Sequence, residues 1–471
     1  MLFFARRQFS PTNNMPSRIV TRARPLSVPR IQACAPMTTT PATAPFQPKE
    51  TPAKPVVQRP PRNRVFQELP LSDLVRTLSV LSVAALPAPL LSAIIAFVRR
   101  HSSAIVSSRL LSWPIRRTFY KAFCVGESKS EIAANIATLR SRGINGVVLS
   151  FAREAKLDGT ETNSTSGEED VALKSWVASN IETIAQVSSS DYIAVKFTGA
   201  GAKAVQAMQE FKYTDSTKVD GLKALKEGMF EVCEFAKQRR VKVMVDAESS
   251  LHQPAIDHLT LEAMAKYNTD GSALVFNTYQ MYLKASLDNL KSHLNIASAQ
   301  GYTMGIKLVR GAYIYVEPDR AGLIQDTKPD TDNAYDAAVD LLLRGTHAAP
   351  AHPWAAEVML ATHNTQSVDT AMSLFRSRPA GKQPVQKLVF AQLMGMADEI
   401  SMKLASEIKS MDGAAKAGDV SVYKYSVWGS LEDCLLYMLR RAEENQDAAA
   451  RSRVTAGLML SEVGNRMAFW R

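Results

Sequence analysis

Cysteine is scarce in this 471-residue sequence, and the residues present are far apart. Cys34, Cys124, Cys233 and Cys434 are too scattered for the disulfide framework of a small secreted domain, and they lack the close pairs of a structural zinc site. The seven histidines include no HExxH pair, which argues against metal-assisted hydrolysis. With 46% hydrophobic and 21% charged residues, the composition is that of a globular protein long enough to bury a large core.

Acidic residues are missing from the first 49 positions, and Glu50 is the first. The segment holds seven cations, which are Arg6, Arg7, Arg18, Arg22, Arg24, Arg30 and Lys49. An acid-free start that bears arginine and serine is typical of a mitochondrial targeting segment, here expected to be a disordered presequence. Without it the chain has 49 basic and 45 acidic residues, so the net charge falls from +11 to +4. The nearly balanced remainder argues against a nucleic-acid partner.

The longest uncharged run, from Thr77 to Val98, covers 22 residues, with Pro87 and Pro89 at its centre. Its length would span a bilayer, but paired prolines remove backbone donors where lipid offers no replacement. Two apolar helices joined by a turn, packed on the protein or dipping into one leaflet, fit better than a span. We therefore expect residues 1–49 to be a targeting segment and linker, 50–120 a linker and apolar helical arm, and 121–471 a catalytic barrel.

Short runs of β-branched and aliphatic residues recur eight times after residue 140, and a longer helical pattern follows each. The runs begin at Gly146, Tyr192, Val241, Ala273, Met304, Val358, Leu388 and Val422. Seven are almost continuously apolar, which is typical of parallel strands buried on both faces. Eight strand–helix units in one chain predict an α/β fold, the (β/α)8 TIM-like barrel.

Polar side chains lie where the predicted strands end, which is where such barrels hold their active sites. These residues are Lys196, Asp246 with Glu248, Gln280, Arg310 with Tyr313, Thr362-His363-Asn364, Gln392 and Tyr425. Any one of them could be a solvated loop residue, but their recurrence favours a site. Gly199–Ala204 imitates a dinucleotide-binding fingerprint, although no acidic residue follows at the usual place, and small residues at a helix start explain it better.

The segment Leu431–Asp447 predicts a final helix on which Tyr437, Arg440, Arg441 and Glu444 stand at i, i+3, i+4 and i+7. Adjacent guanidinium groups are costly to hold together unless an anion lies between them, and arginine binds carboxylates in a bidentate manner. The alternative is a solvated basic patch with a glutamate partner.

Together these residues resemble the proline dehydrogenase family in its eukaryotic mitochondrial form. The resemblance covers about residues 115–450 and rests on seven motifs in order. They are Val195-Lys196, Val245-Asp-Ala-Glu248, Asn277-Thr-Tyr-Gln280, Lys307-Leu-Val-Arg-Gly-Ala-Tyr313, Ala361-Thr-His-Asn364, Gln392-Leu-Met-Gly395 and Tyr437-xx-Arg-Arg-xx-Glu-Asn445. One departure is visible, since many bacterial relatives carry arginine at the position of Lys307.

The resemblance implies a distorted barrel that holds FAD non-covalently and oxidises L-proline to 1-pyrroline-5-carboxylate. It implies that electrons pass to a membrane quinone, on the matrix side of the mitochondrial inner membrane. By this likeness Arg440 and Arg441 clamp the substrate carboxylate beside Lys196, and the pocket is lined by Asp246, Tyr313, Leu393, Tyr425 and Tyr437. The residues implied for the flavin are Gln280, Lys307, Arg310, Gly311, Ala312, Thr362, His363, Asn364 and Glu444.

Three other functions stay open on the sequence. One is a Schiff-base aldolase with Lys196 as nucleophile. Another is a non-enzymatic inner-membrane scaffold that uses residues 77–98. Within the family, the alternative is oxidation of hydroxyproline, and its specialised relatives tend to lack the tyrosine matched by Tyr425.

Overall fold

The computed structural model describes residues 66–67, 69–152, 166–215, 217, 219, 221–314, 317, 320–345, 354–378, 383–411, 419–447 and 449–468. The predicted targeting segment and nearly all of the linker after it lie outside these residues. So does most of the segment of residues 153–170, whose polar and acidic sequence predicts a loop insertion after the first strand.

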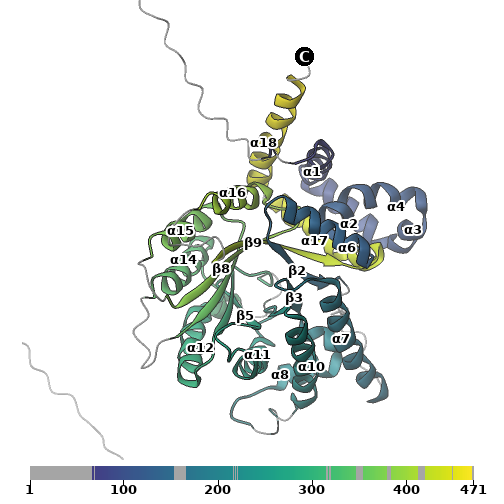
Figure 1. Cartoon of the computed structure of the whole chain (residues 1–471). Coiled ribbons are helices and arrows are strands. Elements are labelled where there is room, and N and C mark those ends of the chain that lie inside the picture. The colour runs from purple at the N-terminus through teal and green to yellow at the C-terminus, as the bar shows by residue number, and fades with distance from the viewer. Residues whose placement is uncertain are drawn as a thin grey trace, which may run out of the picture. The chain divides into compact units, whose positions relative to one another are not determined.

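Eight parallel strands form a closed barrel, as the sequence predicts (Figure 1). They are β2 Gly146–Phe151, β3 Tyr192–Val195, β4 Lys242–Val245, β5 Val275–Gln280, β6 Met304–Val309, β7 Ala356–Ala361, β8 Val385–Leu393 and β9 Val420–Trp428. Each strand pairs with the next in the chain, and β9 also pairs with β2, which closes the sheet. The α/β barrel and its order are therefore confirmed.

Helices surround the barrel because the crossovers between parallel strands must bury their apolar faces against it. The main surrounding helices are α6 Lys129–Ser141, α7 Ser166–Gln186, α8 Ala202–Glu210, α10 Lys223–Arg239, α11 Gln253–Tyr267, α12 Ser286–Gln300, α14 Lys328–Arg344, α15 Thr365–Arg376 and α16 Asp398–Lys409. Shorter turns are the 3₁₀ segment Phe197–Ala200 and α13 Arg320–Leu323.

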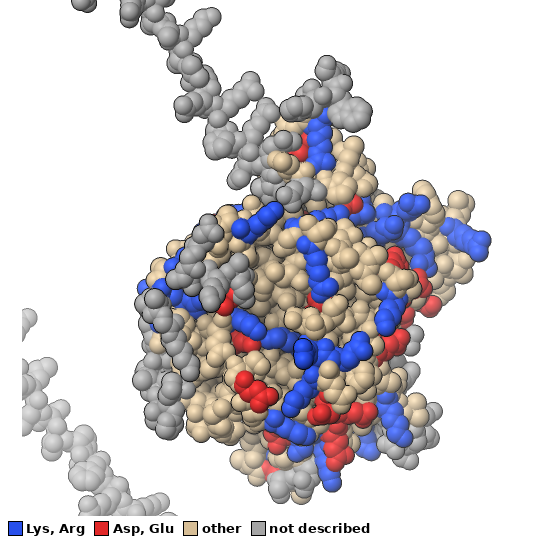
Figure 2. Space-filling view, viewed as in Figure 1, with Lys and Arg blue, Asp and Glu red and all other residues tan. Residues whose placement is uncertain are grey.

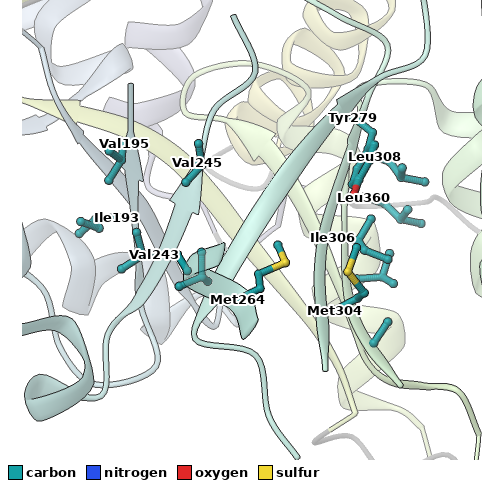
Figure 3. Packing of buried hydrophobic residues seen from close by; sticks show 14 of the residues in the cluster. Ile193, Val195, Val243, Val245, Met264, Tyr279, Met304, Ile306, Leu308 and Leu360 are labelled. Carbon is teal, nitrogen blue, oxygen red and sulfur yellow. The ribbon is translucent and has the colours of Figure 1, made fainter. Parts of the chain in front are cut away.

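Two sets of buried side chains alternate along the strands. One set packs outward against the helices, and Figure 3 shows members such as Val195, Val245 and Leu308. The other set occupies the alternate positions of the strands and fills the barrel interior; Ala194, Met244 and Phe276 belong to it. Because side chains in a strand point to opposite faces in turn, the residue number decides which side chains enter the barrel.

The N-terminal helices confirm the predicted break at the prolines. Helix α1 (Leu71–Ala84) and helix α2 (Ala88–Arg100) meet at an angle of 106°. Among the described residues no single helix is long and apolar enough to cross a membrane, and α1 with α2 meets that test only as a bent pair. Four short helical segments follow, namely α3 Ser102–Ser107, α4 Arg109–Ile115, the π-turn Arg116–Tyr120 and α5 Lys121–Phe123.

Four sequence expectations were wrong. The short strand β1 (Cys124–Gly126) was missed, and it pairs with the last residues of β9. Strand β9 therefore continues to Trp428, so Tyr425 lies inside the strand and not at its end.

The other two errors concern helix boundaries. Helix α7 begins at Ser166, so the acidic loop predicted through Asp170 ends earlier. Helix α17 (Leu431–Asp447) is not the last helix, because α18 (Ala449–Ala468) follows it and packs against α1. The Arg466 guanidinium at the end of α18 donates hydrogen bonds of 2.7 and 2.9 Å to the carbonyls of Leu69 and Phe66.

The structure makes Gly305 in β6 a position where a side chain cannot fit. A Cβ atom there would lie 2.2 Å from the Val275 carbonyl oxygen and 2.8 Å from the Phe276 ring. We expect Gly305→Ala to lower the free energy of unfolding by about 1–3 kcal/mol, because the barrel interior would be overpacked. The matched control is Gly457→Ala on α18, where nothing lies within 4 Å; there we expect a gain of about 0.5–1 kcal/mol. Denaturant unfolding of the three proteins measures both, and equal stability of the two variants would contradict the packing at Gly305.

Candidate active site

The alternation of the strands places four of the predicted site residues in the phase of the interior face. Lys196 and Asp246 follow Ala194 and Met244, which are interior residues of β3 and β4, at a spacing of two. On β5, Gln280 lies on the same face of the strand as Phe276. On β9, Tyr425 lies on the same face as Tyr423. The carboxyl ends of the strands therefore bring to one mouth residues that are more than 200 positions apart.

A buried carboxylate joins three of the predicted residues. Asp246 accepts a hydrogen bond of 2.6 Å from the Lys307 Nζ at Oδ1, and one of 3.1 Å from the Tyr425 hydroxyl at Oδ2. The Lys307 ammonium also lies 5.4 Å from the centre of the Tyr425 ring. Asp246 is 8% exposed and Lys307 is 7% exposed, so water competes weakly with this ion pair. Lys307, which the resemblance implies for the flavin, thus contacts two residues implied for the substrate pocket.

A second carboxylate was noted in the sequence but given no role. Glu248 is 2% exposed and accepts hydrogen bonds from the backbone nitrogen (3.1 Å) and the hydroxyl of Thr198. Burial raises the pKa of Glu248, although these hydrogen bonds and the positive charge of Lys196 oppose that shift. Glu248 therefore fixes the turn that directly follows Lys196. Its position two residues after Asp246 is the signal that could have marked it.

Gln280 extends this network to the next loop. Its side-chain nitrogen donates 2.8 Å to the carbonyl of Glu248, and its side-chain oxygen accepts 3.2 Å from the backbone nitrogen of Ala312. Gly311, which directly precedes Ala312, has φ +138°, and a Cβ there would lie 1.8 Å from the Tyr282 ring. Only glycine permits this turn, which leads to a half-buried Tyr313.

Arg310 is held by side chains from three elements. Its guanidinium donates to the Asp332 carboxylate on α14, to the Thr362 hydroxyl (2.8 Å) and to the Ser367 hydroxyl on α15 (2.9 Å). The hydrogen bonds from Lys328 and Arg310 keep the pKa of Asp332 below its usual range, against the opposing effect of burial. Asp332 and Ser367 were missed because a helix face shows no preference for a site until the helix is packed.

The Thr362–Asn364 segment is ordered by its neighbours. Asn364 caps α15, its side-chain oxygen accepting 3.1 Å from the Ser367 backbone nitrogen. The His363 Nε2 accepts 3.1 Å from the backbone nitrogen of Leu393, the last residue of β8. Its other ring nitrogen therefore bears the proton whenever this histidine is neutral.

Helix α17 adds the final group. Tyr437 and Arg441 are buried at 6% and 9% exposure, and the guanidinium lies 5.0 Å from the centre of the phenol ring. Arg441 donates 2.6 Å to Glu444, so this glutamate, which the resemblance implies for the flavin, contacts the arginine implied for the substrate. Neither the Tyr437 hydroxyl nor the Arg441 Nε has a hydrogen-bond partner among the described residues. Arg440, one residue earlier, is half-buried.

Electrostatics connect this helix with the barrel mouth. Burial raises the pKa of both Tyr425 and Tyr437 well above the usual range, and the nearby Lys196 cation opposes the shift in each case. Both phenols therefore remain protonated at neutral pH and act as hydrogen-bond donors. The Lys196 ammonium is therefore close enough to both phenols for its charge to act on each.

The residues present fit a flavin nucleotide and an amino-acid carboxylate. The cations Lys196, Lys307, Arg310 and Arg441 lie around one mouth, and two buried donors at Tyr437 and Arg441 still require an acceptor. The Tyr282 ring lies directly against Gly311, so the turn that leads into Tyr313 has no room for a side chain of its own at that position. A mouth of this composition suits an anionic ligand, and it lies where barrel enzymes hold their active sites.

The family model for "Proline dehydrogenase" matches residues 132–454, which include the whole barrel and α17. The chain belongs to the proline dehydrogenase family and is an oxidoreductase of that family. This membership argues against the aldolase and scaffold alternatives.

Similar proteins agree with this membership. The chain is 30% identical to the probable mitochondrial proline dehydrogenase of Schizosaccharomyces pombe, over 71% of this chain and 77% of that protein. It is 31% identical to mitochondrial proline dehydrogenase 1 of Homo sapiens, over 72% of this chain and 54% of that longer protein. It is 27% identical to the hydroxyproline dehydrogenase of Bos taurus, over 84% of this chain and 91% of that protein.

A solved structure supports the fold. Proline utilization A from Bdellovibrio bacteriovorus, inactivated by N-propargylglycine, superposes with a TM-score of 0.55 at 18% identity. The match covers 82% of this chain and 37% of that much longer chain.

The buried ion pair can be tested by its effect on stability. We expect Lys307→Met to lower the free energy of unfolding by about 3–5 kcal/mol, because it leaves the Asp246 carboxylate buried without its cation. The double variant Lys307→Met/Asp246→Asn should recover part of that loss, since the unpaired charge is gone. Denaturant titrations of Lys307→Met and of the double variant measure these free energies of unfolding. Lys307→Arg is the control, because it keeps a positive charge beside Asp246. A double variant no more stable than Lys307→Met would contradict the pairing.

Proposed function

We propose that this protein catalyses the FAD-dependent oxidation of L-proline to 1-pyrroline-5-carboxylate. The observation that supports this most directly is the pair of buried donors on α17, the Tyr437 hydroxyl and the Arg441 Nε, which have no described partner. A buried donor without an acceptor is costly, so a ligand acceptor at this position is favoured. The carboxylate of an amino acid is such an acceptor.

Arg440 and Arg441 bind this carboxylate, and Lys196 adds a third positive charge. Adjacent arginines on one helix turn repel each other until an anion neutralises them, which gives the substrate its affinity and its orientation. Glu444 holds the Arg441 guanidinium from the other side at 2.6 Å, so its fork is oriented before the substrate arrives. The Thr198–Glu248 contact does the same for the segment that carries Lys196.

The pyrrolidine ring lies among Asp246, Tyr313, Leu393, Tyr425 and Tyr437. FAD held here would supply the oxidant, a flavin ring able to take a hydride from the ring carbon next to the nitrogen. This chemistry needs the neutral amine, so the ammonium proton passes to bulk water as the substrate enters the pocket. Because Lys307 neutralises Asp246 at 2.6 Å, this carboxylate positions Tyr425 and is not a free base.

The flavin is held by residues from the ends of β5, β6 and β7 and from α17. We assign this role to Gln280, Lys307, Arg310, Gly311, Ala312, Thr362, His363, Asn364 and Glu444. Cationic side chains balance its phosphates and its reduced, more negative ring. Arg310 contributes mainly by fixing the loop, since Asp332, Thr362 and Ser367 already engage its guanidinium.

We further propose that the electrons pass to a quinone in the mitochondrial inner membrane, and that the enzyme lies on its matrix side. The seven cations and absent acids of residues 1–49 support the mitochondrial location. A reporter fused after residue 49 should enter mitochondria, and import of a version with Arg6, Arg7, Arg18 and Arg22 changed to Gln would contradict that role.

Arg441 should govern substrate affinity. We expect Arg441→Met to raise the KM for L-proline roughly tenfold or more, since a hydrogen bond to a charged group contributes about 1.5–3 kcal/mol. Turnover is measured with a soluble dye as electron acceptor, in variants with equal flavin content. The control is Arg344→Met, which removes an exposed arginine that pairs with Asp340 at the last turn of α14. An unchanged KM in Arg441→Met would contradict the carboxylate assignment.

A second candidate substrate is hydroxyproline, because the similar bovine protein is named a hydroxyproline dehydrogenase. Tyr425 argues for proline in this chain. Its ring is fixed by the hydrogen bond to Asp246 and by the Lys307 ammonium beside it. A phenol held against the pyrrolidine ring leaves no room for an added hydroxyl.

Tyr425→Ser should therefore weaken proline binding and raise the kcat/KM for 4-hydroxyproline relative to that for proline. An apolar wall alone discriminates against a hydroxyl by only about 100-fold, so a steric block is the stronger device. Tyr425→Phe is the matched control, because it keeps the ring and loses only the hydroxyl. The ratio of the two kcat/KM values should move toward hydroxyproline in the serine variant much more than in the phenylalanine variant. A ratio that does not move would show that Tyr425 is not the selective residue.

A further inference from the structure

The segment of residues 88–117, which we call the outer arm, has apolar side chains on two sides of its first helix. On α2, Leu91 and Ile95 are buried at 1% and 4% exposure and pack in one cluster with Leu435 and Met438 of α17. A neighbouring stripe at i, i+4 and i+7 is exposed instead, with Leu90 at 49%, Ile94 at 37% and Phe97 at 60%. An amphipathic surface helix would present polar residues there.

A second exposed apolar group follows on α4. Leu110 is 84% exposed, Leu111 is 51% exposed and Trp113 is 62% exposed. Tryptophan with leucine and phenylalanine on a helix surface is typical of segments that lie at a membrane interface. Single exposed apolar residues need no explanation, but six within 24 residues do.

The charge of the outer arm has one sign. From Leu74 to Gly126 the sequence contains no acidic residue and seven cations, five of which lie in the outer arm. These five are Arg99, Arg100, Arg109, Arg116 and Arg117. Arg99 and Arg116 meet acidic partners from outside the arm, at 3.8 and 2.8 Å, whereas Arg100 and Arg109 have none among the described residues. Figure 2 shows blue side chains on tan at the outer end of this region, at the right of the molecule.

We infer that the outer arm docks on an anionic lipid surface, with Leu90, Ile94, Phe97, Leu110, Leu111 and Trp113 entering the interface and the arginines meeting phospholipid phosphates. Apolar burial and attraction to anionic lipid add in such binding, and neither needs a spanning helix. A second copy of this chain would explain the apolar residues but not the accumulation of cations, since identical surfaces repel each other.

This docking would place the active site next to the membrane. Helices α2 and α3 contact α17, the helix that bears Tyr437, Arg440 and Arg441. The reason for docking rests on the proposed function, in which electrons pass to a membrane quinone. The position of the docking surface rests on the exposed residues of the outer arm alone. Lipid docking and the use of quinone can therefore fail separately.

The test is flotation of the purified full chain with phosphatidylcholine vesicles, made with and without cardiolipin. We expect the protein to float with the cardiolipin vesicles, less with phosphatidylcholine alone, and less again when salt is added. The variants Ile94→Ser/Phe97→Ser and Leu110→Ser/Trp113→Ser should each weaken binding roughly tenfold or more. Arg100→Gln/Arg109→Gln should reduce the preference for cardiolipin.

The matched control is Val171→Ser/Leu460→Ser, which removes two apolar side chains of 64% and 59% exposure outside the outer arm. All variants should keep the flavin and the dye-coupled oxidation of proline. Brominated lipid should quench the fluorescence of Trp113, measured as the difference between the wild type and Trp113→Phe.

Three results would overturn the inference. The first is a wild type that does not float with cardiolipin vesicles, and the second is equal loss of binding in the arm and control variants. The third is a wild-type dimer that the arm variants convert to a monomer with flotation unchanged, which would make this face a self-association surface. A purified wild type that contains no flavin or shows no dye-coupled oxidation of proline would instead contradict the proposed function.

Discussion

The site depends on closure of the barrel by β9. This strand hydrogen-bonds to β2 along one edge and to β8 and β1 along the other. Without that closure the Tyr425 hydroxyl would not reach Asp246, which is 179 positions earlier in the chain. Because closure gives every strand two neighbours, the interior phase of each is fixed, and Lys196, Asp246, Lys307 and Tyr425 face one mouth.

Carboxylates then fix residues that we propose for contact with the ligand. Asp246 holds Lys307 and Tyr425, Glu248 holds the turn after Lys196, and Glu444 holds Arg441. In the function we propose, each acid orients its partners before a substrate arrives, so little side-chain freedom is lost on binding. The buried donors of α17 are the exception, since the protein supplies them with no described acceptor.

The sequence predicted the barrel correctly, and also the strand ends except that of β9, because both depend on local pattern. Continuous apolar runs mark buried parallel strands, and the polar residues that end them include Lys196, Asp246 and Gln280. It could not predict β1, since three residues give no pattern and pair only where β9 extends past β8. The partners of Arg310 on α14 and α15 were also missed, because the choice of partner depends on helix packing. The roles of the individual site residues stay predictions.

The most direct measurement is the visible spectrum of the purified protein, before and after anaerobic addition of L-proline. The proposed function predicts a yellow protein whose flavin absorption is bleached by L-proline. A colourless protein, or a flavin spectrum that L-proline does not change, would contradict it.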